Sequence, residues 1–176
     1  MGDQARNERW AKKQYLGETK GTNDTMGIHK KIPIRMADET LLPLSPAEVW
    51  PVLADIARYP SWWPRLLFVR LLHAHPGLVG TVYAIRPYGW RSFRCRVESF
   101  EEPLRLCLQY EGSYMRGVAE WRLEPVDQGT RVIYSMDAEV NDLVVALFGT
   151  VINLKSVHSY SMRGIFHNLK QQLFRP

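Results

Sequence analysis

The chain has 176 residues and a mass of 20.4 kDa, which fits one compact domain with an additional tail. Hydrophobic residues make up 45% of the sequence and charged residues 23%, a globular composition that excludes disorder throughout. The longest apolar stretch, residues 143–154, is shorter than a membrane-spanning helix of about 20 residues and contains Gly149, Thr150 and Asn153. We therefore expect no insertion into a membrane.

Positive charge is concentrated at the N-terminus. Of the formal net charge of +5, +3 belongs to residues 1–31, so the rest of the chain is nearly balanced. This balance weakens a nucleic-acid interpretation of the pI of 9.3, and we expect no nucleic-acid partner. Cys95 and Cys107 cannot form a disulfide framework, and the N-terminus lacks the apolar segment of a signal peptide. Free thiols and a cytoplasmic location are therefore expected.

Residues 1–30 form a polar segment without a sustained apolar period. Such a segment cannot offset the entropy cost of ordering, so we predict a flexible N-terminal arm and a folded domain over residues 31–176. Two alternatives stay open: that the chain starts at Met26, and that the arm is a weak tether to anionic surfaces, which leaves transient membrane contact open.

The first elements of the domain are a strand and a helix. Alternation over residues 32–37 predicts a half-buried strand. Ser45 and Pro46 then supply an N-cap and a first helical residue, and the following apolar spacing predicts a helix over residues 46–57. Pro60 and Pro64 limit the next stretch to a turn or a short helix.

The middle of the sequence consists of strand patterns joined by tight turns. Strands are predicted over residues 66–72, 81–86, 92–100, 104–110, 117–123 and 131–140. Connections this short join antiparallel neighbours, so these strands should form a meander.

The C-terminal segment, residues 142–173, has no proline and carries apolar residues at helical spacing. It predicts one long helix. The fold class is therefore α+β, with a curved antiparallel seven-stranded sheet wrapped around a long C-terminal helix.

This order of elements resembles the START/polyketide-cyclase-like superfamily, also called SRPBCC or helix-grip. The similarity covers about residues 32–174. The sequence motifs that carry the resemblance are residues 44–50 (LSPAEVW), 59–64 (YPSWWP), 117–125 (GVAEWRLEP), 129–134 (GTRVIY) and the terminal helix with His158 and Met162. The resemblance implies a ligand-binding domain with a deep, mostly apolar cavity, but no particular reaction.

A cavity is also expected on geometric grounds, because a curved sheet cannot press its whole inner face against one helix. Plain core packing is the alternative for each aromatic residue. The candidate ligand-binding residues are Trp50, Trp62, Trp63, Tyr83, Arg86, Phe93, Tyr110, Trp121, Tyr134, Leu154, His158 and Met162.

His158 is the polar residue most suited to chemistry. On a helical wheel it lies with Ile165 and Leu169 on the face turned toward the sheet, whereas His167 should face solvent. An imidazole there could position or protonate a ligand oxygen, or it could be a core histidine bonded to a strand carbonyl. Tyr134 could donate a hydrogen bond to an enolate oxygen.

Arginine is the second candidate. Alternation directs Arg94 and Arg96 toward solvent, where acids can pair with them. If an arginine points inward, an anionic or ketone-bearing ligand would be its partner, and Arg86 and Arg122 are the best candidates. The candidate catalytic residues are therefore His158, Tyr134 and Arg122.

Motifs for other chemistries are missing from the sequence. His73 and His75 share a strand face without an evident third ligand, and no phosphate-binding loop, nucleophile elbow or metalloprotease motif occurs. We expect no metal and no cofactor. The leading hypothesis is binding or transport of a small hydrophobic molecule such as a lipid, quinone, polyketide or aromatic metabolite. The alternative is an enzyme that uses the same cavity, a polyketide cyclase or dehydratase of the lyase or isomerase class. A third hypothesis is a protein-interaction module. Oligomeric state is not evident.

Overall fold

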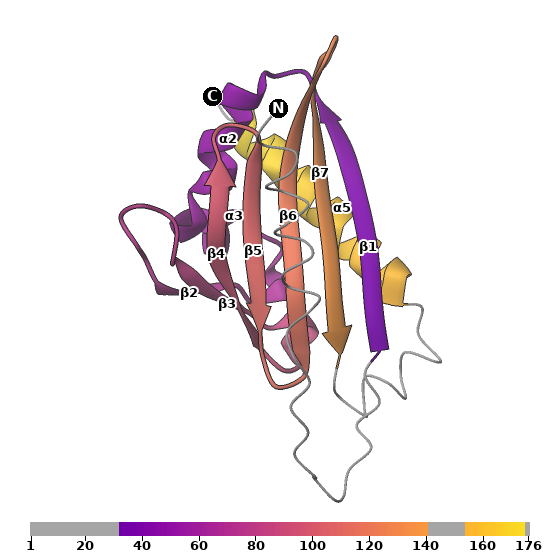
Figure 1. Ribbon diagram of the computed structural model, residues 1–176. Helices are drawn as coiled ribbons and strands as arrows, with labels where there is room; N and C mark the ends of the chain where they lie inside the picture. Colours follow the sequence, from indigo (N-terminus) through magenta and orange to yellow (C-terminus); the bar gives the residue numbers. More distant parts are fainter. Residues whose placement is uncertain (1–31, 141–153, 175–176) are drawn as a thin grey trace, which may run out of the picture.

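The computed structural model describes residues 32–140 and 154–174. The predicted N-terminal arm and the first part of the predicted C-terminal helix lie outside the described residues. In chain order the elements are β1 (Ile32–Leu42), α2 (Pro46–Ala54), the 3-10 turn η1 (Ile56–Arg58), α3 (Tyr59–Trp62), η2 (Arg65–Leu67), β2 (Arg70–His73), β3 (Val82–Ile85), η3 (Pro87–Gly89), β4 (Phe93–Glu101), β5 (Arg105–Glu111), β6 (Met115–Val126), β7 (Gly129–Val140) and α5 (Leu154–Leu173) (Figure 1).

The strands form one seven-stranded sheet in the order β1-β7-β6-β5-β4-β3-β2. Each neighbouring pair is antiparallel, and β1 closes the order by pairing with β7 along its whole length, from Ile32 opposite Val140 to Leu42 opposite Thr130. Helix α5 crosses one face of the sheet diagonally, with α2 and α3 beside its C-terminal end (Figure 1). The predicted α+β helix-grip fold is confirmed.

Alternation along the strands separates the core from the outer face of the sheet. On β6, Ala119, Trp121 and Leu123 are buried, whereas the residues between them are partly exposed. The outer positions carry ion pairs such as Arg105 with Glu120, whose Nε and Oε2 atoms lie 3.5 Å apart. Each large apolar side chain moved from water to the inner face contributes about 1.5 to 3 kcal/mol, so this face holds α5 in place.

Helix α2 begins where the sequence predicts and ends earlier. The carboxylate of Glu48 accepts hydrogen bonds from the backbone N–H of Ser45 at 2.8 Å and from its hydroxyl at 2.7 Å, which fixes the N-terminus. The predicted continuation to residue 57 is wrong, because Asp55 has a non-helical ψ of 72° and a separate turn, η1, follows. The chain bends there and brings Tyr59 into the core.

The predicted strand over residues 66–72 is also placed too early. Residues Arg65–Leu67 form η2, and Phe68 has a left-handed φ of 41°, so β2 begins only at Arg70. An apolar run that follows Pro64 does not become a strand because its backbone turns.

Helix α5 packs through Met162, Ile165, Phe166 and Leu169, all buried. The side-chain amide of Asn168 donates a hydrogen bond to the backbone carbonyl of Trp62 at 2.6 Å and so links α5 to α3. No helix in the described part of the chain is long and apolar enough to cross a bilayer.

Candidate functional site

His158 on α5 faces the sheet, as its helix position predicts. Its Nδ1 atom lies 3.0 Å from Oδ2 of Asp38, which projects from the inner face of β1, and both side chains are mostly buried. The histidine ring also stacks on Tyr134 of β7, with centroids 6.0 Å apart. Because a carboxylate accepts only, Nδ1 carries the proton, and Nε2 is left as the acceptor.

Asp38 is a site residue that the sequence analysis missed. The predicted strand ends at residue 37, whereas β1 continues to Leu42. Asp38 lies two positions after Met36 and four after Ile34, so its side chain points to the same face of the strand as theirs. A prediction that extended the alternation beyond residue 37 would place this carboxylate on the inner face.

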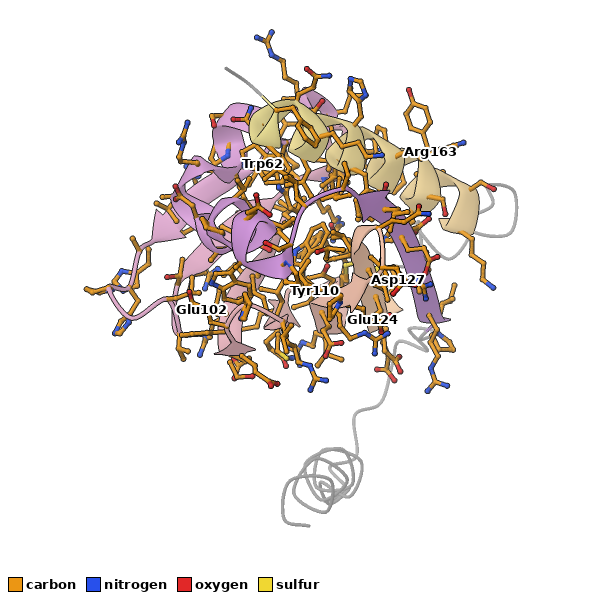
Figure 2. The ribbon with its side chains drawn as sticks, turned by 90° about the horizontal axis from the view of Figure 1, so that it is seen from above. Trp62, Glu102, Tyr110, Glu124, Asp127 and Arg163 are labelled. Carbon is orange, nitrogen blue, oxygen red and sulfur yellow. The ribbon has the colours of Figure 1, made fainter. Side chains whose placement is uncertain are left out.

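Tyr134 connects His158 with two further aromatic residues. Its hydroxyl forms a hydrogen bond with the hydroxyl of Tyr110 from β5. Its ring contacts Trp121, its direct partner on β6, with centroids 4.6 Å apart. Tyr110 is buried and is labelled near the middle of the view in Figure 2. These five residues, Asp38, Tyr110, Trp121, Tyr134 and His158, are called the interior polar cluster below.

Small residues give the two tyrosine rings room to meet. Tyr110 pairs with Gly117, whereas Tyr134 pairs with Trp121, four residues further along β6. Between these positions the inner face carries only Gly117 and Ala119. At Gly117 a Cβ atom would lie 2.3 Å from the backbone oxygen of Asp137, so no side chain fits there. The rings can therefore lie along the sheet toward each other.

Two hydrogen-bond donors of the interior polar cluster have no acceptor within it. The indole Nε1 of Trp121 is buried and has no partner among the described residues. In the Tyr110–Tyr134 pair one hydroxyl donates a hydrogen bond and the other accepts it. The proton of the accepting hydroxyl therefore has no acceptor within the pair. A buried donor without a partner costs about 1 to 3 kcal/mol, so an acceptor at this position would be stabilising.

Burial controls the protonation of the cluster. It lowers the pKa of His158 below 6.5, and the nearby charge of Asp38 raises the pKa by a smaller amount, so the imidazole is neutral at pH 7. Burial raises the pKa of Tyr134 well above 10, so its phenol stays protonated. The cluster therefore presents neutral donors and one neutral base.

Three of the predicted lining residues belong to a separate aromatic group. Trp62, Trp63 and Tyr83 surround Tyr59, with ring centroids 4.9 to 5.5 Å from it. The hydroxyl of Tyr59 donates to the backbone carbonyl of Leu53 at 2.6 Å. These rings pack against one another, so core packing describes them, although Nε1 of both tryptophans lacks a partner within the described residues.

Both arginines predicted to point inward lie elsewhere. Arg122 is on the outer face of β6, where its Nε is 3.2 Å from Oε1 of Glu124. Arg86 is exposed, and its guanidinium lies over the ring of Phe68 at 4.9 Å. Strand alternation and the η3 turn direct both side chains outward, so an inward orientation of Arg86 and Arg122 is wrong, whereas their functional roles stay predictions.

The other candidates are spread through the core. Trp50 packs against Phe100, and Phe93 packs against Tyr110. Met162, a residue of α5, is buried. The side chain of Leu154 lies outside the described residues. Phe93 thus joins the edge of the interior polar cluster, whereas Trp50 lies apart from it.

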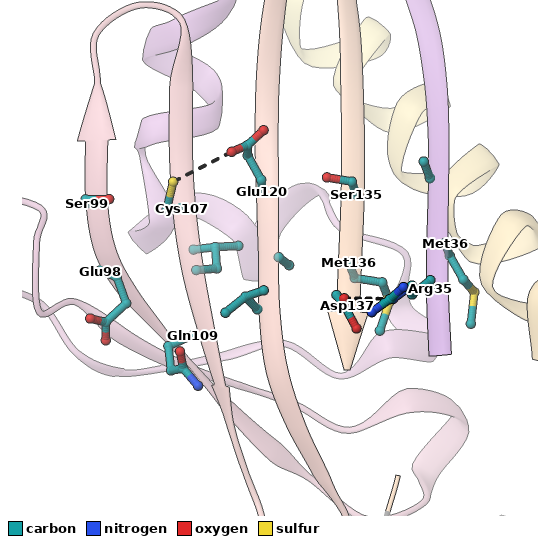
Figure 3. A pocket seen from close by; sticks show the side chains of 14 residues that line it. Arg35, Met36, Glu98, Ser99, Cys107, Gln109, Glu120, Ser135, Met136 and Asp137 are labelled. Atoms are coloured by element: carbon teal, nitrogen blue, oxygen red, sulfur yellow. Dashed lines mark hydrogen bonds and ion pairs between the residues drawn. The ribbon is translucent and has the colours of Figure 1, made fainter. Parts of the chain in front are cut away.

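An open hollow of about 620 Å³ lies on the opposite side of the sheet, across the outer faces of β1 and β4–β7. Figure 3 shows charged side chains around it, including the Arg35–Asp137 ion pair and the contact of Cys107 with Glu120. Of its charged groups, Arg35 and Asp137 pair with each other, and Glu120 pairs with Arg105. The predicted apolar space beneath α5 stays a prediction.

The seven-stranded sheet and α5 define a helix-grip domain. A family model described as polyketide cyclase / dehydrase and lipid transport matches residues 33–173. The chain belongs to this family. No curated protein matches the sequence significantly.

Solved structures share the fold at low sequence identity. Truncated norcoclaurine synthase from Thalictrum flavum superposes with a TM-score of 0.63 and 12% identity, over 86% of this chain and 99% of that chain. An uncharacterised protein from Rhizobium leguminosarum gives 0.61 and 12%, over 85% and 100%. The di-domain ARO/CYC StfQ from the steffimycin biosynthetic pathway gives 0.60 and 11%, over 79% and 50%. At these identities the likeness concerns the fold alone.

Proposed function

We propose that the protein binds a small hydrophobic molecule, of the lipid, quinone, polyketide or aromatic kind, between the inner face of the sheet and α5. The family description, the apolar inner face and the interior polar cluster support this proposal. The two free cysteines fit a reducing compartment, so we also propose a cytoplasmic location.

The observation that carries the proposal is the pair of donors in the interior polar cluster that lack an acceptor. The indole N–H of Trp121 and the remaining hydroxyl proton of the Tyr110–Tyr134 pair both need an acceptor. One ligand oxygen accepts two hydrogen bonds, so a carbonyl or hydroxyl oxygen would satisfy both donors. The ligand would then be an apolar body with an oxygen at the cluster.

Apolar burial would supply most of the affinity. Removing about 300 Å² of ligand surface from water contributes roughly 7 kcal/mol before the costs of association, which permits micromolar binding. The oxygen would orient the molecule, since a neutral hydrogen bond adds only about 1 kcal/mol.

Native mass spectrometry of the gently purified protein tests for a bound molecule. A matched titration tests the site: 2-naphthol should bind more tightly than naphthalene, and Tyr134→Phe should weaken 2-naphthol binding about fivefold while leaving naphthalene binding unchanged. Tyr160→Phe, an exposed position on α5, serves as the control. A bare polypeptide together with no binding of either probe would overturn the proposal.

The pairing of His158 with Asp38 favours a second candidate, an enzyme of the cyclase or dehydratase kind. Nε2 of neutral His158 can take a proton from the carbon beside a carbonyl, while donors of the cluster hold the enolate oxygen. The enolate carbon then forms a bond to a second carbonyl carbon of the same molecule. The imidazolium returns its proton to the resulting alkoxide, and loss of water completes the sequence.

Deuterium exchange at the α-carbon of 2-tetralone, followed by NMR, separates the two candidates. An enzyme should accelerate the exchange, and His158→Ala should reduce the rate at least about a hundredfold with a smaller change in probe affinity. Asp38→Asn should lower the rate and shift its pH profile, because Asp38 positions His158. Exchange at the rate of buffer alone, with the probe bound, would leave binding as the function and exclude this base.

A further inference from the structure

Two stretches of the chain carry cations and no acid. From Ile56 to Val97 the chain contains seven arginines and no aspartate or glutamate. Helix α5, from Leu154 to Leu173, contains Lys155, Arg163 and Lys170 and likewise no acid. Because α5 packs beside the short helices of this segment, the two acid-free stretches adjoin in space.

Within this region, large apolar side chains are exposed around two turns. Leu66 and Phe68 at η2 are 52% and 49% exposed, and Tyr88 and Trp90 at η3 are 41% and 50% exposed. Such residues scattered singly need no explanation, but four of them on adjoining turns form a patch. Together with the cations between them they are called the basic aromatic surface: Arg65, Leu66, Phe68, Arg86, Tyr88 and Trp90.

Two residues of the basic aromatic surface have an unfavourable backbone conformation, and hydrogen bonds fix its turns in place. Phe68 and Tyr88 are non-glycine residues with left-handed φ angles of 41° and 53°, a conformation that costs about 1 to 3 kcal/mol and tends to occur where function requires it. The N–H of Arg86 donates to the carbonyl of Leu67 at 3.0 Å, which ties η3 to η2. A hydrogen bond of 2.7 Å between the hydroxyls of Tyr88 and Ser161 ties η3 to α5.

The arginines of the basic aromatic surface are not neutralised by acids. No carboxylate of the described residues lies within ion-pair distance of Arg65 or Arg86, whereas Arg35, Arg96 and Arg105 on the outer face of the sheet all have one. The guanidinium of Arg86 covers the ring of Phe68 instead. A second arginine–aromatic contact is present on α5, where Arg163, labelled in Figure 2, lies over the ring of exposed Tyr160 at 5.9 Å.

We propose that the basic aromatic surface docks on an anionic lipid bilayer. Arginines near such a bilayer gain roughly 1 kcal/mol each, and aromatic side chains with one polar end favour the bilayer interface. The exposed leucine and phenylalanine distinguish this partner from a nucleic acid, whose phosphates would leave Leu66 in water. Docking is independent of the interior polar cluster and of the proposed function.

Vesicle co-sedimentation of the full chain tests the docking. Vesicles of phosphatidylcholine with about one third phosphatidylglycerol should bind the protein, vesicles of phosphatidylcholine alone should bind it much more weakly, and high salt should release it. The double variant Arg65→Gln/Arg86→Gln should weaken binding about 25-fold, at about fivefold for each arginine.

A second variant separates the apolar contribution from charge. Phe68→Asn removes an apolar side chain while keeping a residue that tolerates the left-handed conformation, and it should weaken binding several-fold. The matched controls are Val118→Ser, an exposed apolar residue on the outer face, and Arg35→Gln, an acid-paired arginine. Circular dichroism establishes that each variant is folded.

Three results would overturn the proposal. Equal binding to both kinds of vesicle would remove the electrostatic argument. Binding that none of the variants of the basic aromatic surface weakens would assign it to another part of the chain, such as residues 1–31. Salt-sensitive binding to RNA without binding to the anionic vesicles would assign the surface to a nucleic acid.

Discussion

Burial and the charge of Asp38 shift the pKa of His158 in opposite directions, and burial has the larger effect. The pKa of His158 is lowered below 6.5 in the folded protein, with Asp38 on β1 and Tyr134 on β7 as the ionisable groups that face it. The unfolded chain therefore binds the proton more readily, so the stability from neutral His158 is fully present above pH 6.5 and is lost as the pH falls through the lowered pKa.

Denaturant titrations at pH 7 and pH 5 check this prediction. The protein should lose more unfolding free energy on acidification than His158→Gln does. The exposed His73, His75 and His167 are common to both proteins and cancel in the comparison. Parallel losses in the two proteins would contradict the assignment.

Tyr59 makes a prediction about stability alone. Its side chain is fully buried, and its hydroxyl satisfies the backbone carbonyl of Leu53 in the last turn of α2. Tyr59→Phe leaves that carbonyl without a partner and should lower the free energy of unfolding by about 1 to 3 kcal/mol. Urea unfolding of this variant beside Tyr160→Phe, where the tyrosine is exposed, gives the measurement. Equal stability of the two variants would show that water replaces the phenol.

How far the sequence predicts a single residue depends on which pattern places it. Helical periodicity was sufficient to turn His158 toward the sheet, because the apolar stripe of α5 is regular. The partnership with Asp38 depends on the pairing of β1 with β7, two strands almost a hundred residues apart along the chain, and no local pattern contains that register. The Tyr110–Tyr134 contact depends on the registers of β5 with β6 and of β6 with β7, which no local pattern contains either.

At the scale of elements, the tight turn between β6 and β7 packs closely against the last residue of β1. Gly129 has a φ of 129°, and a Cβ atom there would lie 2.0 Å from the backbone oxygen of Leu42, the last residue of β1. Gly129→Ala should therefore cost about 3 kcal/mol or more, because both the backbone and the neighbouring chain must move.

Gly89 supplies the matched comparison. It also has a positive φ, of 77°, but a Cβ atom there would meet nothing within 4 Å. Gly89→Ala should cost only about 1 to 2 kcal/mol, the penalty for the left-handed conformation. Thermal unfolding followed by circular dichroism measures both variants, and a Gly129→Ala protein as stable as Gly89→Ala would contradict the crowding argument.

Elements were predicted well where alternation or helical spacing was long, and poorly where it was interrupted. All strands after β2 lie within a few residues of their predicted bounds, because glycine and proline mark their turns. Apart from the first strand, which continues beyond its predicted end to Leu42, the errors fall between Asp55 and Arg70, where prolines, short turns and a left-handed Phe68 follow one another. There the apolar residues face the core without forming a regular element, so periodicity carries no information.

At the scale of the whole molecule, the proposed ligand would occupy the same interior that the folded chain packs. The rings that close the core around Tyr59 make the end near α3 rigid, whereas the middle of the sheet carries Gly117 and Ala119 and the unsatisfied donor of Trp121. A ligand that occupies the middle would stabilise the folded state by mass action. At a concentration about one hundred times the dissociation constant the gain is about 2.7 kcal/mol, or roughly 5 to 10 °C in Tm for a chain of this size.

Ala119→Met tests where that stabilisation arises. The longer side chain would occupy the inner face between Leu108 and Met136, the direct partners of Ala119, and should abolish the rise in Tm with 2-naphthol. Ala37→Met places the same side chain on the exposed outer face of β1 and should keep the full response. If Ala119→Met still responds and Ala37→Met does not, the ligand occupies the outer hollow, since Ala37 borders it, and the interior assignment fails.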